Sequence, residues 1–224
     1  MNRTLPPRQP IPREVLQTGA PGFLWALVGV MAAIELALYL SDAGLIGSRD
    51  WRWSAFQIGA FWKPLLSGEM APTYSGQTIL MFVTYAFLHG GIVHLAMNCV
   101  VLLALGKFSA ARIGKGKTLL VLFLSAIGGG LAFGLLANSA VPMIGASGAV
   151  FGLIGVWQAW DYRMRQQLRL PIKPLAMAIL ALVAVNLVFF VILDGGLAWE
   201  AHLGGWLVGW LSGRSFAQSS LSVS

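Results

Sequence analysis

The sequence holds a small set of side chains of the kinds that nucleophilic catalysis uses. Ser147 lies in the glycine-rich run GASGAVFG, and the chain has only 3 histidines, His89, His94 and His202. A serine hydroxyl is a weak nucleophile until a base within hydrogen-bond reach takes its proton. The oxyanion that forms on attack then needs donors already in place. A serine and a histidine brought together would therefore suit acyl-transfer chemistry.

The spacing of small residues predicts which histidine lies beside Ser147. Glycines flank and follow the serine at positions 145, 148 and 152, namely Gly145, Gly148 and Gly152. A second run has small residues around His202 with a period of four: Ala201, Gly205 and Gly209. Small residues at this period allow two membrane helices to approach backbone to backbone. We expect the two runs to dock and to bring Ser147 beside His202.

Donors for the oxyanion are expected from a third segment. His94 and Asn98 are four residues apart, so they share one face of a helix. Backbone N–H groups at the first turn of a helix are also free to donate. A carboxylate that would orient the base is harder to find, because Glu200 is too close in sequence to His202 to face it on a helix. These residues therefore indicate a Ser–His dyad rather than a triad.

The chain that carries these residues is too apolar for a water-soluble enzyme. Of its 224 residues, 57% are hydrophobic and 10% are charged, and the mean hydropathy is +0.75. Soluble domains are about 45–50% apolar and about 25% charged. The composition predicts an integral membrane protein and excludes a secreted disulfide scaffold or a disordered segment. The net charge of +7 is therefore no argument for nucleic-acid binding, because basic residues mark cytoplasmic helix ends in membrane proteins.

Six apolar segments are predicted to form transmembrane helices. They lie at residues 23–40, 91–106, 117–137, 147–160, 174–193 and 199–215. Residues 1–22 are interpreted as a short basic cytoplasmic tail, 23–215 as one six-helix domain and 216–224 as a C-terminal tail. The connection 41–77 mixes tryptophans with basic residues, which is typical of a segment lying partly in the membrane interface. The fold class predicted is therefore an all-α membrane protein.

The basic residues predict the orientation of these helices. With the N-terminus in the cytoplasm, all but three of the 15 lysines and arginines lie on the cytoplasmic side; the exceptions are Arg49, Arg52 and Lys63. The positive-inside rule then predicts that both termini are cytoplasmic. The second, fourth and sixth helices all begin at the outer face in this arrangement. Ser147 is expected on the order of 10 Å below the outer surface, because about 14 residues of helix follow it across a core about 30 Å thick.

Three elements of the sequence together resemble the rhomboid intramembrane serine proteases. They are the GASG run with Ser147, the two histidines His89 and His94 followed by Asn98, and Ala201-His202 followed by Gly205 and Gly209. The resemblance extends from about residue 84 to residue 209. Many members of this family also carry a Trp-Arg pair just before the second helix. Here that place holds Leu80-Met81, and the Trp51-Arg52 pair of this chain lies much earlier.

The resemblance implies a role for each candidate residue. Ser147 would be the nucleophile and His202 the general base, with His94, Asn98 and the Ser147 amide forming the oxyanion hole. Phe151 stands where the family often has an aromatic residue packing on the catalytic imidazole. Supporting roles fall to Gly145, Gly148, Gly205, Gly209 and His89.

The activity implied is hydrolysis of transmembrane protein substrates through an acyl-enzyme. The membrane implied is a bacterial inner membrane, with the site opening toward its outer face. Membrane lipids are expected partners, while no nucleic acid, metal or cofactor is expected.

Other readings of the same residues differ in what they require. One alternative is a non-catalytic rhomboid-like protein that binds transmembrane helices. Another is a small transporter that uses the polar residues around Ser147 as its binding pocket. An intramembrane metalloprotease is disfavoured because the chain has no HExxH motif. An aspartyl protease would need two aspartates within the helices, whereas Asp161 and Asp194 lie at helix ends. For Glu35, in the first helix, we favour a structural role, in which its side chain either bonds the loop or snorkels outward. His89 is interpreted as a structural hydrogen-bond partner of the loop.

Overall fold

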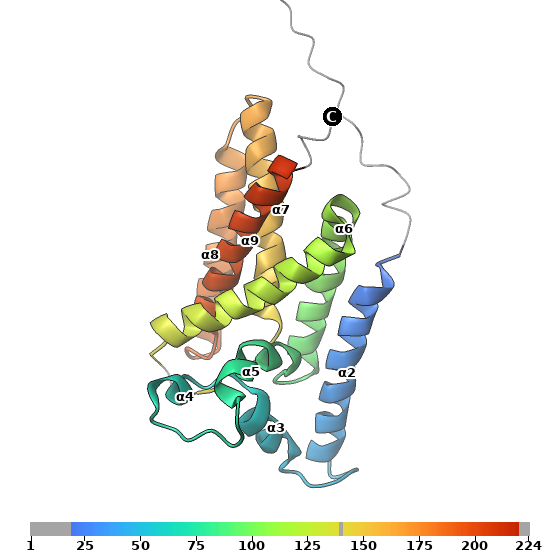
Figure 1. Cartoon of the computed structure of the whole chain (residues 1–224), viewed down its shortest axis with the longest axis vertical. Helices are drawn as coiled ribbons and strands as arrows, with labels where there is room; N and C mark the ends of the chain where they lie inside the picture. The colour runs from blue at the N-terminus through green and yellow to red at the C-terminus, as the bar shows by residue number, and fades with distance from the viewer. Residues whose placement is uncertain (1–18, 139–140, 220–224) are drawn as a thin grey trace, which may run out of the picture.

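The computed structural model describes residues 19–138 and 141–219, and its regular structure there is helical apart from one isolated bridge between Phe61 and Met143. Five long helices make up the bundle: α2 (Gly22–Asp42), α6 (Ile92–Leu136), α7 (Ser147–Gln167), α8 (Lys173–Ile192) and α9 (Trp199–Ser219). Four short helices belong to the connection between α2 and α6: α3 (Trp51–Gly59), α4 (Lys63–Ser67), α5 (Gln77–Thr84) and η1 (Tyr85–Phe87). Figure 1 shows the short helices gathered at one end of the bundle. The N-terminal 18 residues and the last five of the predicted tails lie outside the described residues.

Three of the described helices are long and apolar enough to cross a membrane: α2, α6 and α8. Helix α6 has 45 residues because it joins two helices across a bend at Gly114, where the backbone takes φ 81° and ψ 165°. The predicted segments 91–106 and 117–137 lie on either side of this bend. Helices α7 and α9 are not among these three, and both contain glycines and polar or charged residues between their apolar ones. Several of these glycines lie where the two helices face each other.

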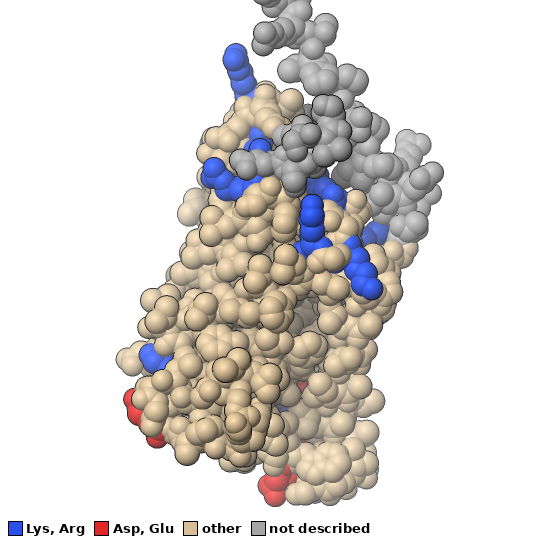
Figure 2. Space-filling view, viewed as in Figure 1, with Lys and Arg blue, Asp and Glu red and all other residues tan. Residues whose placement is uncertain are grey.

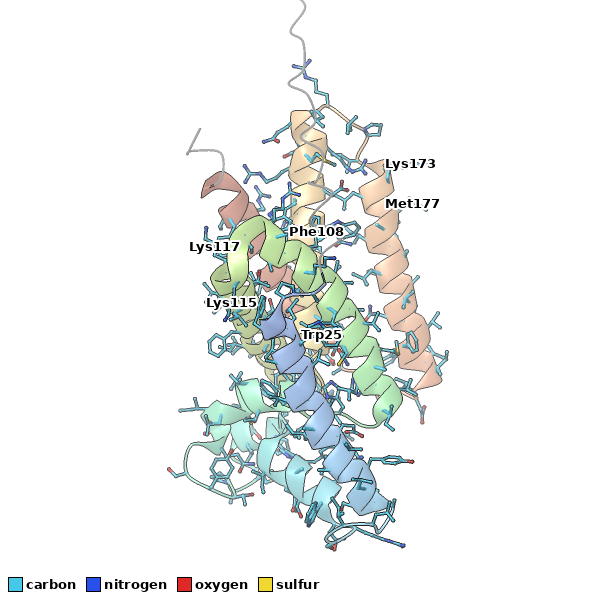
Figure 3. All side chains as sticks on the ribbon, turned by 90° about the vertical axis from the view of Figure 1, so that its right-hand side faces the viewer. Trp25, Phe108, Lys115, Lys117, Lys173 and Met177 are labelled. Carbon is cyan, nitrogen blue, oxygen red and sulfur yellow. The ribbon has the colours of Figure 1, made fainter. Side chains whose placement is uncertain are left out.

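Side-chain contacts show which helix ends lie close to one another. At the bend of α6, the Lys115 ammonium lies 5.8 Å from the centre of the Phe23 ring at the start of α2. The Arg163 guanidinium of α7 donates a 2.7 Å hydrogen bond to the Arg214 carbonyl of α9. The α6 bend therefore shares one end of the molecule with the start of α2, and the late parts of α7 and α9 meet each other. Figure 2 shows most of its lysines and arginines gathered toward the end of the molecule where the bend of α6 lies, and Figure 3 labels Lys115 and Lys173 among them.

Helices α7 and α9 pack with their backbones in contact. A Cβ atom added to Gly205 would lie 1.9 Å from the Gly148 carbonyl oxygen, and one added to Gly209 would lie 1.9 Å from the Gly152 oxygen. Neither position can hold a side chain larger than hydrogen unless the two helices move apart. The pair of helices is visible side by side in Figure 1.

Helix α8 packs far less closely than the others. Only 6% of the residues in its apolar stretch are buried, and Leu175 is the buried residue of this helix. Figure 3 shows α8, with Lys173 and Met177 labelled, standing at the edge of the bundle. A helix that is apolar on nearly all sides and exposed on most of them is suited to contact with lipid.

Candidate active site

A glycine turn leads directly into Ser147, the first residue of α7. Gly145 has φ +110°, a conformation that residues with a side chain rarely adopt, and its N–H donates a 2.9 Å hydrogen bond to the Tyr85 carbonyl. A Cβ atom at this position would also lie 2.7 Å from Nε2 of His94. The backbone conformation and the close approach of the imidazole therefore both require glycine here. The turn brings the half-buried Ser147 next to the segment that contains His94.

The first turns of α7 and α9 bring Ser147 and His202 to the same level. The His202 ring is buried and stacks on the ring of Phe151, with centroids 4.0 Å apart and planes 9° from parallel. The carbonyl oxygen of Ala201 lies 3.4 Å from the position that a Cβ atom of Gly148 would take. Each member of the predicted pair thus has a sequence neighbour in contact with the other helix. Among the described residues the Ser147 hydroxyl makes no hydrogen bond to His202, and such bonds are often loose before substrate binds.

His94 presents one nitrogen toward the turn before Ser147. The Gly90 backbone N–H donates to Nδ1 of His94 at 3.4 Å, so that nitrogen is an acceptor and the ring hydrogen is assigned to Nε2. Nε2 is the atom that lies over Gly145. The Asn98 side chain, one helical turn later, is buried and donates one hydrogen from Nδ2 to the His94 carbonyl at 2.9 Å. An amide nitrogen carries two hydrogens, so the second remains available to a ligand.

His89 is placed behind this site rather than in it. Its side chain is fully buried, and its Nε2 lies 3.5 Å from the backbone N–H of Ala146, the residue before Ser147. The rings of His89 and His94 meet edge to face with centroids 5.1 Å apart. A ring without exposed surface has no direct access to a substrate, but it can hold the turn that precedes α7.

An arginine from the connection between α2 and α6 ties this region to the first described helix. Arg52 of α3 pairs with both carboxylate oxygens of Glu35 at 3.0 and 3.1 Å, contacts Asp42 at 2.6 Å, and donates to the His89 carbonyl at 2.9 Å. Burial would lower the pKa of Arg52, but the bonds to Glu35 and Asp42 together raise it. Of the two structural roles considered for Glu35, the bond to the loop is therefore the one present in the structure. Arg52 of the Trp51-Arg52 pair, although early in the sequence, thus reaches the entry to α6.

The same connection also braces the segment before Ser147. Phe61 and Met143 pair through two backbone hydrogen bonds of 3.0 and 2.9 Å, which form the isolated bridge. The Phe61 ring is fully buried and packs edge to face on the ring of Tyr85, whose carbonyl receives the Gly145 N–H. The connection between α2 and α6 is thus part of the framework that holds the serine.

Sequence reasoning missed one residue that touches the site. Asn186 lies in the middle of α8, and its Oδ1 is 2.5 Å from Nδ1 of His202. Its Nδ2 donates a 2.8 Å hydrogen bond to the Leu182 carbonyl of the same helix. The available signal was a single amide in an otherwise apolar stretch, because polar groups within membrane helices are costly and usually functional.

Within the described parts of the chain, no three histidine, cysteine, aspartate or glutamate side chains come together in a way that could hold a metal ion. The polar side chains at the site are instead a hydroxyl, imidazoles and amides from α6, α7, α8 and α9. These groups are suited to proton transfer and to hydrogen bonding of a carbonyl oxygen.

Comparison with known proteins gives a consistent set of relatives. Rhomboid-like protease 3 of Toxoplasma gondii is 34% identical over 145 residues, which are 65% of this chain and 54% of that protein. RHOMBOID-like protein 4 of Arabidopsis thaliana is 34% identical over 132 residues, 57% of this chain and 31% of that protein. Rhomboid protease GlpG of Yersinia pestis is 31% identical over 157 residues, 66% and 55% of the two chains. The chain thus spans about half the length, or less, of these relatives.

A family model gives the same assignment. The rhomboid domain model matches residues 76–219, which is well over half of the chain. The matched region contains α5 to α9 and therefore Ser147, His94, Asn98, Asn186 and His202. With its apolar helices, the chain is an integral membrane protein that belongs to the rhomboid family.

Proposed function

We propose that this chain is an intramembrane serine protease that hydrolyses peptide bonds in or near the transmembrane segments of other membrane proteins. The observation that carries the proposal is the docking of α7 on α9, which puts the first turns that contain Ser147 and His202 against each other. Because the protein is itself embedded in the membrane, its substrates are expected to be membrane proteins too. The names of the relatives, two of which are proteases, point to the same reaction class.

The proposed reaction begins with proton transfer from the Ser147 hydroxyl to Nε2 of His202. Oγ bonds to the carbonyl carbon of the scissile peptide, and the carbonyl oxygen becomes an oxyanion. Collapse of this intermediate breaks the C–N bond, and the leaving amine takes the proton from His202, which leaves an ester on Ser147. Water then attacks the ester with His202 as base, and the carboxylic acid product and the free serine are released. Nδ1 of His202 is already bonded to Asn186, so Nε2 is the nitrogen available to Ser147.

The oxyanion would be stabilised by three donors. They are Nε2–H of His94, the second Nδ2 hydrogen of Asn98 and the backbone N–H of Ser147, which has no partner within its helix because it is at the first position. The hydrogen bonds that His94 and Asn98 make elsewhere support this role, since they leave the donor sides of both groups uncommitted. Donors held in place before the reaction cost no reorganisation when charge develops.

Asn98→Ala is expected to lower kcat for cleavage of a transmembrane substrate by about 10²–10³-fold while KM changes little, because it removes one oxyanion donor. The measurement is steady-state cleavage in detergent or in proteoliposomes. Cys99→Ala, the neighbouring position on α6, is the matched control and should keep the activity of the unmodified protein. An Asn98→Ala protein that folds and turns over substrate at the normal rate would contradict the proposed oxyanion hole.

The proposed topology has six transmembrane helices with both termini in the cytoplasm. It counts the two halves of α6 as separate crossings and adds α7 and α9. These two helices are included because they pack against neighbouring helices, not because of their hydropathy. The basic end of the molecule supports a cytoplasmic position for that end under the positive-inside rule. The site would then open toward the outer face of the membrane, which in a bacterium is the periplasmic or extracellular side.

Covalent labelling tests the proposed nucleophile without knowledge of the natural substrate. A fluorophosphonate probe should label the protein at Ser147, because the probe reacts only with a serine that an adjacent base activates. Labelling should disappear in His202→Ala, although the serine is still present. A folded protein that is never labelled would instead be a non-catalytic member that binds transmembrane helices.

A further inference from the structure

The contact between α8 and the imidazole of His202 carries an inference that rests on the proposed function. We propose that Asn186 is a positioning residue that fixes the tautomer and the ring orientation of His202, so that Nε2 faces Ser147 with a free lone pair. Asn186 would thus do through an amide oxygen part of what the carboxylate does in a Ser-His-Asp triad. The analogy covers orientation alone, since a neutral amide cannot stabilise an imidazolium by charge.

The hydrogen bonds of Asn186 decide which of its side-chain atoms faces the imidazole. Nδ2 is a donor and lies 2.8 Å from the Leu182 carbonyl oxygen, whereas Oδ1 lies 2.5 Å from Nδ1 of His202. If the amide were turned over, its oxygen would lie against the Leu182 oxygen and two acceptors would repel each other. Oδ1 is therefore the atom that faces His202.

This assignment determines the proton position on the ring. An amide oxygen can only accept, so Nδ1 of His202 must carry the hydrogen, and in the neutral ring Nε2 is then unprotonated. An unprotonated Nε2 is what a general base needs in order to take the Ser147 proton. The opposite tautomer would present an N–H to the hydroxyl and could not act as the base.

Two contacts of different kinds hold the ring. Phe151 covers one face of the imidazole at a centroid distance of 4.0 Å, which restrains tilting of the ring. Asn186 holds the Nδ1 edge, which restrains rotation within the plane of the ring. Stacking on Phe151 alone would leave this rotation free, because a ring face offers no directional partner.

The position of Asn186 on α8 also makes its contribution separable from general packing. Leu175, the buried residue of α8, is 11 positions away, so about 16 Å of helix separates the two contacts. Among the described residues, the bond from Asn186 to His202 is the hydrogen bond that joins an α8 side chain to another helix. Weakened packing at Leu175 and loss of the amide at Asn186 can therefore be compared as two different perturbations of one helix.

The test combines a spectroscopic readout with kinetics in the full-length protein. Samples labelled with ¹⁵N-histidine contain only three imidazoles, and the spectrum of His202→Ala identifies the signals of His202. The unmodified protein should show His202 protonated on Nδ1, with that proton shifted downfield by the short bond. Asn186→Leu should lose the downfield proton and populate both tautomers, whereas Asn186→Asp, which keeps an acceptor, should retain it.

The kinetic expectation follows from the tautomer. Asn186→Leu should lower kcat and the rate of fluorophosphonate labelling by about 10²-fold, the loss typical of a misaligned catalytic group, with KM nearly unchanged. Asn186→Asp should recover most of both rates. Leu175→Ala is the packing control, which should lower thermal stability in detergent and leave the tautomer and the labelling rate as they were.

The possible outcomes separate the inference from the proposed function. A proton on Nε2 of His202 in the unmodified protein would overturn the inference, even if Asn186→Leu failed to fold. Equal losses of labelling in Asn186→Leu and Leu175→Ala would also overturn it, because Asn186 would then act through packing. An unmodified protein with the Nδ1 tautomer that never labels would instead contradict the proposed protease function while leaving the positioning of His202 in place.

Discussion

Replacement of Ser147 with alanine is expected to abolish cleavage of a transmembrane substrate, with a loss of at least about 10⁴-fold. The proposed reaction has no other nucleophile, and the residual rate would come only from the oxyanion donors and from substrate binding. His202→Ala should produce a loss of similar size, since an unactivated hydroxyl attacks a peptide too slowly to matter. The measurement is cleavage of a single-span substrate in proteoliposomes, followed on gels at several enzyme concentrations.

The double variant of Ser147 and His202 sharpens this result. Residues that act as one unit give losses that do not add, so the double variant should be no less active than either single one. Ser109→Ala is the matched control, because Ser109 is also a buried serine in a membrane helix and its hydroxyl has no hydrogen-bond partner among the described residues. Normal cleavage by Ser147→Ala would refute the proposed mechanism outright.

The parts of the site that follow a short-range pattern were predictable from the sequence. Small residues recur every four positions in each of two segments, and this spacing predicts that the segments dock. The glycines of α7 and α9 make that contact, and they do so at the same spacing of four. His94 and Asn98 were expected on one face of a helix, and the Asn98 amide bonds to the His94 carbonyl across one turn. In each case the information lies within a few residues of chain.

Contacts made across long stretches of chain were not predictable in the same way. Arg52 lies 37 residues before His89, whose carbonyl it binds, and neither residue belongs to a pattern that includes the other. Asn186 is one amide in an apolar helix, so it has no spacing to interpret, and its partner is known only once α8 is placed against α9. Such contacts depend on the packing of whole helices, which the sequence of one segment does not contain.

The helix count shows the same division between local and distant information. Hydropathy identifies α2, α8 and the two halves of α6, because these segments are apolar regardless of their neighbours. It is weak for α7 and α9, in which glycines and polar side chains take the place of apolar residues. Helices that face other helices need small residues for close packing more than they need hydrophobic ones. The most informative helices for function are therefore the least obvious ones by hydropathy.

Gly205→Val is expected to cost both activity and stability, which distinguishes it from the loss of a catalytic side chain. The first added carbon would lie 1.9 Å from the Gly148 carbonyl oxygen, and backbone on the opposite side cannot turn away as a side chain could. Helices α7 and α9 must separate, and Ser147, which precedes Gly148, would move away from His202. A misplacement of about 1 Å can cost about 10²-fold in rate, and overpacking typically destabilises by about 1–3 kcal/mol.

Gly29→Val provides the control, because Gly29 lies exposed in α2 with no atom within 4 Å of an added Cβ. The same substitution there should leave cleavage and thermal unfolding in detergent unchanged, which isolates the effect of helix contact from the change of residue type. Ser147→Ala should unfold at the temperature of the unmodified protein, whereas Gly205→Val should unfold earlier and label poorly with a fluorophosphonate. If Gly205→Val kept normal stability and labelling, close contact between α7 and α9 would not be what brings the serine and the histidine together, and the observation that carries the proposed function would be lost.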